Sequence, residues 1–187
     1  MAITLLVLNI TVPATGTPGT LAHKLLAQWP AYAAYATSFI TIGIIWINHH
    51  AMISRLREAD HAILMLNLIL LLTVGVIPFA TALLTTYLKE GHGANLAAAV
   101  YGGVLLAMAV AFVTLNRHIL FVKAHKLKSE LPLELRRQIL ARSVRGLLPY
   151  VVATALAAAS PYATLAVTAA LAVYYAFPIA SGVQLEA

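Results

Sequence analysis

Residues 62–84 read AILMLNLILLLTVGVIPFATALL, and this stretch decides the fold class. It contains no Asp, Glu, Lys or Arg along its whole length. A helix of about 20 mostly apolar residues crosses the roughly 30 Å of hydrocarbon in a bilayer. Inside lipid the backbone must satisfy its own hydrogen bonds, which a helix does within one segment. The stretch therefore predicts a membrane-spanning helix, and the chain is predicted to be an all-α integral membrane protein.

The composition of the whole chain points the same way. Of its 187 residues, 61% are hydrophobic and 10% are charged. Soluble chains are about 45–50% apolar and about 25% charged, so too few charges remain here to coat a soluble globule. Soluble enzymes, disordered chains and nucleic-acid modules are thereby excluded as leading interpretations. The chain has no cysteine, which excludes a disulfide framework and a thiolate metal site.

Working outward from residues 62–84, further apolar blocks predict a single transmembrane domain, residues 1–187, that is a bundle of six spans. The complete spans are predicted at residues 30–53, 62–84, 96–116, 141–159 and 161–180, with Ser160-Pro161 as the turn between the last two. Residues 1–12 are apolar but would reach only about 18 Å as a helix, so they predict a first span shortened at its N-terminus. Residues 122–140 form a basic connector, and residues 132–145 have the pattern of a short amphipathic helix.

The basic residues predict the orientation. One alternate set of loops and helix ends holds Arg55, Arg57, Arg117, Lys123, Lys126, Lys128, Arg136, Arg137, Arg142 and Arg145. The other set holds only Lys24 and Lys89. By the positive-inside rule the first set is cytoplasmic, which predicts a multi-pass protein of the cell membrane with both termini cytoplasmic. The net charge of +6 is then assigned to lipid head groups and not to a nucleic acid.

The predicted spans carry few groups capable of chemistry. None has an acidic or basic residue in its middle, whereas proton-coupled pumps and many transporters keep such a group for their work. No phosphate-binding glycine loop and no G-x-S-x-G elbow occurs. His49 and His50 are adjacent and point about 100° apart on a helix, so they do not chelate as an i, i+4 pair would. We therefore expect no metal site, no cofactor and no enzyme activity.

A polar cluster is predicted between two of the spans. Trp46 and His49 are three residues apart and share a helix face. Asn67 lies at a similar depth in the next, antiparallel span. Buried polar groups in lipid need partners, so His49, Asn67 and the Trp46 N–H are expected to meet. Such a cluster serves either as plain helix–helix contact or as part of a functional site.

The leading segment carries an apolar stripe. Met1, Leu5 and Leu8 follow the i, i+4, i+7 spacing of one helix face. The stripe is either an ordinary packing face or the lining of a central axis in an oligomer. In the second case its side chains would form a hydrophobic constriction that gates ions by dewetting, with the hydroxyls of Thr4 and Thr11 near the path.

Three segments carry a resemblance to a known family. They are AITLLVLNI at residues 2–10, SFITIGIIWINHH at residues 38–50, and LNLILLL at residues 66–72 followed by Pro78-Phe79. Together they resemble the prokaryotic, single-repeat branch of the transmembrane protein 175 family, the lysosomal potassium channel family. The W-x-x-H pattern on Trp46 and His49 is the most specific piece.

The resemblance implies a function and an assembly. Members of this branch have six spans and form homotetramers in which the first helix of each subunit lines the pore. Carried over to this chain, the constriction would be formed by Met1, Leu5 and Leu8. Trp46, His49 and Asn67 would form the polar network that holds the pore helix. The implied function is a potassium-permeable cation channel, which conducts K+, with other monovalent cations as further candidate ions.

One departure from the family pattern keeps alternatives open. The first helix of the family opens with an Arg and a Phe-Ser-Asp motif, and neither precedes the matching stretch in this sequence. Two explanations are a start site placed too late and a shortened form. The alternatives to a channel are a small-solute transporter, a non-conducting membrane scaffold, and a membrane enzyme that uses His49, His50 and His61.

Overall fold

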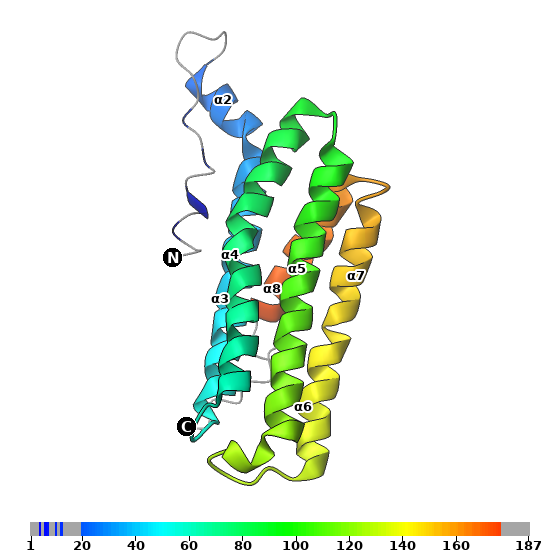
Figure 1. Cartoon of the computed structure of the whole chain (residues 1–187). Coiled ribbons are helices and arrows are strands. Elements are labelled where there is room, and N and C mark those ends of the chain that lie inside the picture. Colours follow the sequence, from blue (N-terminus) through cyan, green and yellow to red (C-terminus); the bar gives the residue numbers. More distant parts are fainter. Residues whose placement is uncertain (1–3, 5, 8–9, 11, 13–19, 177–187) are drawn as a thin grey trace.

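The computed structural model describes residue 4, residues 6–7, residues 10 and 12, and residues 20–176. Across these residues the chain is an all-α bundle of long, roughly antiparallel helices (Figure 1). The helices are α2 (Leu21–Ala27), α3 (Trp29–Ser54), α4 (His61–Glu90), α5 (Ala94–Arg117), the π-helical turn η2 (His118–Val122), the 3-10 turn η3 (Ala124–Lys126), α6 (Leu133–Arg145), α7 (Leu147–Leu156) and α8 (Pro161–Ala176). The predicted all-α class is confirmed.

Several helices have the length and composition of membrane spans. In the described part of the chain these are Trp29–Ser54, His61–Glu90, Ala94–Val122 and Leu133–Leu156, and Pro161–Ala176 is a shorter apolar helix. Helix α4 continues beyond the apolar stretch that predicted it, as far as Glu90. It stops at Gly91, which together with Gly93 adopts the positive φ that favours glycine, and the two residues turn the chain into α5.

Helices α6 and α7 follow one another along the same side of α5 (Figure 1). Helix α6 covers Leu133–Arg145, where the sequence predicts a short amphipathic helix, and α7 resumes after Gly146. A turn at residues 157–160 then leads into α8, whose first residue is Pro161, the position in a helix that proline favours. Of the span predicted at residues 161–180, residues 177–180 lie outside the described ones.

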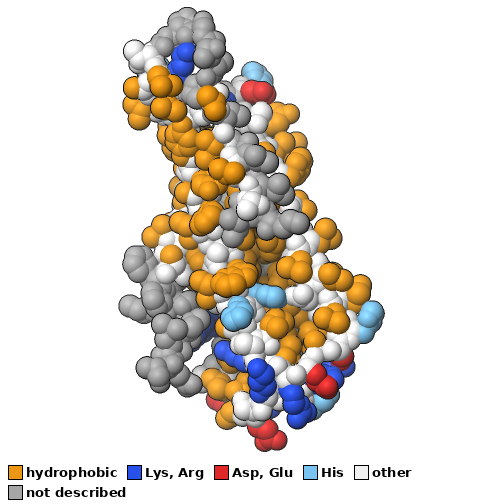
Figure 2. All heavy atoms as spheres, turned by 90° about the vertical axis from the view of Figure 1, so that its left-hand side faces the viewer, with side chains coloured by type: hydrophobic (Ala, Val, Ile, Leu, Met, Phe, Trp, Pro, Cys, Tyr) orange, Lys and Arg blue, Asp and Glu red, His pale blue; other side chains and the backbone are white. Residues whose placement is uncertain are grey.

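Helix α5 occupies the centre of the bundle and packs against α4, α7 and α8. Its packed face contains small residues, among them Ala97, Ala98 and Gly102. A Cβ atom on Gly102 would lie 2.8 Å from Oγ1 and 3.0 Å from Cα of Thr154 in α7. Close backbone approach through small residues is how helices associate where lipid provides no hydrophobic driving force. The outer surface instead carries many large apolar side chains, and Figure 2 shows hydrophobic side chains spread over the face above its charged lower end.

The α3–α4 turn is joined to the segment that follows α5. The amide of Arg57 donates to the carbonyl of Lys126, and the amide of Lys128 donates to the carbonyl of Arg55, both at 2.9 Å. Asp60 caps α4 by accepting a 3.0 Å hydrogen bond from the amide of Ile63. Its other oxygen lies 2.7 Å from Nζ of Lys123. These contacts fix the charged end of the bundle, which lies at the bottom of Figure 2.

The Asp60 contacts predict a pH dependence of stability. The hydrogen bond from Lys123, followed by that from the amide of Ile63, lowers the pKa of Asp60 from 3.8 to about 2. Because the folded pKa is the lower one, this stability is fully present above pH 3.8 and is lost as the pH falls toward 2. We expect the thermal unfolding midpoint of the wild type to fall across that window and that of Asp60→Asn to fall less.

Circular dichroism of the detergent-solubilised protein would measure these midpoints. Glu90→Gln, at the opposite end of α4, is the control and should keep the wild-type pH profile. If Asp60→Asn and the wild type lose stability in parallel between pH 4 and pH 2, then the Asp60 contacts do not contribute as described.

Candidate functional site

Two of the predicted polar residues meet between α3 and α4. Nε2 of His49 lies 2.6 Å from Oδ1 of Asn67, and both side chains are half-buried. His49 precedes the end of α3 by five residues and Asn67 follows the start of α4 by six, so both lie roughly 8–9 Å in from the same end of the bundle. Because an amide oxygen only accepts, the Nε2–H of His49 is the donor. The bond links two of the helices that are long and apolar enough to span a membrane.

Trp46 lies elsewhere on α3. Its indole ring stacks on the imidazole of His50, with ring centroids 5.7 Å apart and an interplanar angle of 20°. Trp46 is 63% exposed, so its ring lies on the outer surface of the bundle. The structure therefore brings His49 and Asn67 together as expected and places the Trp46 ring against His50, the residue one turn further along.

The predicted pore residues fall mainly on undescribed positions. Met1, Leu5, Leu8 and Thr11 lie outside the described residues, while Thr4 is described and exposed. Leu6 is fully buried and belongs to the main hydrophobic core. The leading segment therefore contacts the bundle at Leu6, and the proposed roles of the apolar stripe remain a prediction.

A second polar cluster, in the middle of the bundle, was not predicted from the sequence. Ser38 Oγ in α3 lies 2.8 Å from Oγ1 of Thr81 in α4 and 3.0 Å from Oη of Tyr101 in α5. Thr81 itself donates to the carbonyl of Ile77 at 2.8 Å. Its hydrogen is thus used, so Ser38 donates to Thr81 and Tyr101 donates to Ser38.

This hydroxyl cluster joins three helices through fully buried groups. The side chains of Ser38, Thr81 and Tyr101 are all 0% exposed. Each hydroxyl has a partner, and the chain of donors ends on a backbone carbonyl. The sequence signal was present, since Ser38 and Thr81 are hydroxyl residues within apolar spans, and such residues commonly bond across helices. Which of them meet depends on how each helix is rotated about its axis.

The described residues contain no group of three or more histidine, aspartate or glutamate side chains that could hold a metal ion. The buried polar side chains of the described core are neutral, and several of them donate to backbone carbonyls, as Thr41 does to Thr37 and Thr164 does to Ala153. Such hydrogen bonds between helices can hold neighbouring helices in register.

Comparison with known proteins identifies the family. The family model described as endosomal/lysosomal potassium channel TMEM175 matches residues 1–78. A protein of Streptomyces collinus named as a potassium channel is 44% identical over 177 residues, which are 95% of this chain and 85% of that protein. The chain belongs to the TMEM175 family. The predicted resemblance is confirmed, and Trp46, His49 and Asn67 all lie within the matched residues.

Other related proteins match a smaller part of this chain, and one solved structure has the same fold. A potassium channel of Chamaesiphon minutus is 45% identical over 120 residues, which are 63% of this chain and 59% of that protein. The crystal structure of a lysosomal potassium-selective channel TMEM175 homolog from Chamaesiphon minutus has a TM-score of 0.80 and 37% identity, covering 94% of this chain and 88% of that one. The mouse endosomal/lysosomal proton channel TMEM175 matches at 32% over 74 residues, only 15% of its length.

Proposed function

We propose that this TMEM175-family protein is a potassium-permeable cation channel. The observation that carries the proposal is the 44% identity, over 95% of this chain, to a Streptomyces protein named as a potassium channel. The fold supports it, because the matching Chamaesiphon structure is described as a potassium-selective channel. The family is one of ion channels and not an enzyme class, and we propose no catalytic role for His49, His50 or His61.

The conduction path is proposed to run along the axis of a homotetramer, lined by the first helix of each subunit. Met1, Leu5 and Leu8 would form the hydrophobic constriction, with the hydroxyls of Thr4 and Thr11 near the path. The spans have no acidic residue in their middle, so selectivity among K+ and other monovalent cations would come from pore diameter and dehydration and not from a carboxylate ring.

The bond between His49 and Asn67 is proposed to brace the helices behind this path. It links α3 to α4 at 2.6 Å. Leu6 of the leading segment belongs to the same hydrophobic core as Met52 of α3 and Ile63 of α4. A pair that fixes α3 against α4 would therefore also fix the surface against which the leading segment packs. Trp46 would contribute to this support from the outer surface of α3.

Potassium flux from proteoliposomes tests the channel proposal. Vesicles that contain the purified protein should release K+ faster than empty vesicles, and Leu8→Asn should increase the rate because a polar ring wets a hydrophobic constriction. Leu148→Asn is the matched control, since Leu148 lies on α7 and is 66% exposed. Flux equal to that of empty vesicles would overturn the proposal. Saturable uptake without single-channel currents would indicate a transporter instead.

The proposed orientation in the cell membrane, with the basic end and both termini cytoplasmic, has its own test. The chain has no cysteine, so single cysteines can be introduced without background. His92→Cys, in the exposed α4–α5 turn, should react with a membrane-impermeant maleimide added to intact cells. Ser129→Cys, in the exposed basic segment, should react only after the cells are permeabilised. The reverse pattern would show the opposite orientation.

A further inference from the structure

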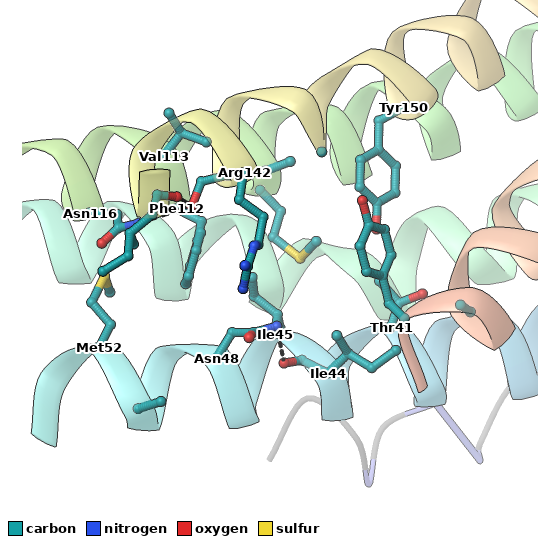
Figure 3. A pocket seen from close by; sticks show the side chains of 18 of the residues that line it. Thr41, Ile44, Ile45, Asn48, Met52, Phe112, Val113, Asn116, Arg142 and Tyr150 are labelled. Carbon is teal, nitrogen blue, oxygen red and sulfur yellow. Dashed lines mark hydrogen bonds between the residues drawn. The ribbon is translucent and has the colours of Figure 1, made fainter. Parts of the chain in front are cut away.

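A crevice opens between α3, α5 and the α6–α7 pair at the basic half of the bundle (Figure 3). Its volume is about 200 Å³. Tyr150 of α7 and Tyr175 of α8 line it at one end, and Arg55, at the C-terminal end of α3, lines it at the other. Helix α3 packs against α4 and α8 but makes little contact with α5, α6 or α7, and the crevice lies between α3 and these three helices.

The lining of the crevice has a polarity gradient. Ile44, Ile45 and Phe112 give it apolar walls. Arg142 and Arg55 supply two positive charges, and no aspartate or glutamate is among the described residues that line it. In Figure 3 the guanidinium of Arg142 reaches from α6 across the crevice toward Asn48 of α3. A ligand that fits these walls is anionic at one end and hydrocarbon at the other.

Arg142 has a charge that the described chain does not balance. It lies nine residues into α6, roughly 14 Å along the helix from Leu133. Its side chain is exposed, and it lines the crevice together with Arg55. Among the described side chains the ion pairs are Asp60 with Lys123 and Glu58 with Lys126, which leaves the guanidinium of Arg142 without a carboxylate.

We propose that this crevice binds the phosphate head group of an anionic membrane phospholipid. Arg142 is the principal contact, because the planar guanidinium fork matches a phosphate in two parallel hydrogen bonds. Arg55 supplies the second positive charge nearer the membrane surface, and the first part of an acyl chain lies along Phe112 and Ile45 toward the bilayer centre. The proposal does not depend on ion conduction, so it stands or falls separately from the channel function.

Lipid binding to the purified full-length chain tests the site. The probes are dioleoyl phosphatidylglycerol, the zwitterionic dioleoyl phosphatidylcholine and inorganic phosphate, each titrated in detergent micelles and followed by native mass spectrometry and thermal unfolding. The wild type should bind phosphatidylglycerol in preference to phosphatidylcholine. Arg142→Gln should weaken that binding about tenfold or more, since charge-assisted hydrogen bonds are lost. Arg142→Lys should weaken it less.

Arg137→Gln is the matched control, because Arg137 is an exposed arginine on the same helix that does not line the crevice. It should bind phosphatidylglycerol nearly as the wild type does. If the Arg137 and Arg142 variants lose phosphatidylglycerol binding equally, the binding depends on general surface charge. That result would overturn the proposed site. Displacement of the lipid by inorganic phosphate at a comparable concentration would show a free-anion site and overturn the lipid assignment.

A second variant keeps the proposal testable if Arg142→Gln does not fold. Ala109 of α5 lines the crevice, and Ala109→Phe would fill it without changing any charge. It should also weaken phosphatidylglycerol binding. A wild type that shows no preference between the two lipids overturns the proposal regardless of any variant.

Discussion

Tyr101→Ala is expected to destabilise the protein by about 2–3 kcal/mol. Tyr101 is fully buried at the centre of the bundle, on α5. In lipid the transfer of apolar surface contributes little to helix association, so the cost comes mainly from the cavity. A cavity costs about 24 cal/mol per Å³, and removing the phenol ring empties on the order of 100 Å³. Equilibrium unfolding in mixed micelles, followed by circular dichroism, would measure the change.

Two further variants distinguish the contribution of the Tyr101 ring to stability from that of its hydroxyl. Tyr101→Phe keeps the ring and removes the donor to Ser38, at a cost of about 1 kcal/mol. Tyr174→Ala removes the same side chain from an exposed position on α8, where Tyr174 is 59% exposed, and should have a much smaller effect. A Tyr101→Ala protein as stable as the Tyr174→Ala protein would contradict the central packing described for α5.

The second large loss of stability is expected from Gly102→Ala, which adds one methyl group to α5. Gly102→Ala places a Cβ atom 2.8 Å from Oγ1 and 3.0 Å from Cα of Thr154, closer than packed atoms approach. Because the Cα belongs to the backbone of α7, a side-chain rotation cannot relieve the overlap and the helices must separate. Overpacking of this kind costs about 1–3 kcal/mol.

Gly103→Ala provides the matched control, since nothing lies within 4 Å of a Cβ atom built there. Alanine also favours helix over glycine by about 0.8–1 kcal/mol. The neighbouring variant should therefore be as stable as the wild type or more stable. Both variants would be compared with the wild type by their unfolding midpoints in the same detergent. We expect the midpoint to fall for Gly102→Ala and to stay the same or rise for Gly103→Ala. Equal effects would contradict the α5–α7 contact.

The helices themselves could largely be predicted from the sequence. A span is set by the thickness of the bilayer, so residues 30–53 and 62–84 coincide closely with the start and length of α3 and with the first part of α4. Hydropathy marks where lipid contacts a helix and not where its backbone hydrogen bonds end. Helix α4 therefore continues past residue 84 until Gly91 turns the chain.

The candidate site was predicted in part, for reasons of geometry. Depth in the membrane can be counted from the span boundaries, and this brought His49 and Asn67 together correctly. The partner of Trp46 depends on side-chain rotamers, and its ring lies against His50. The crevice around Arg142 and the hydroxyl cluster depend on which helices are neighbours, and a linear pattern does not contain that information.

The central place of α5 has a consequence for how the protein is made. The turn at Gly91 and Gly93 joins α4 to α5, so both helices are translated before α7. The face of α5 that carries Gly102 meets Thr154 of α7, a helix that is translated later. Until α7 arrives, this glycine-bearing face has no native cover, and the translocon or surrounding lipid must shield it.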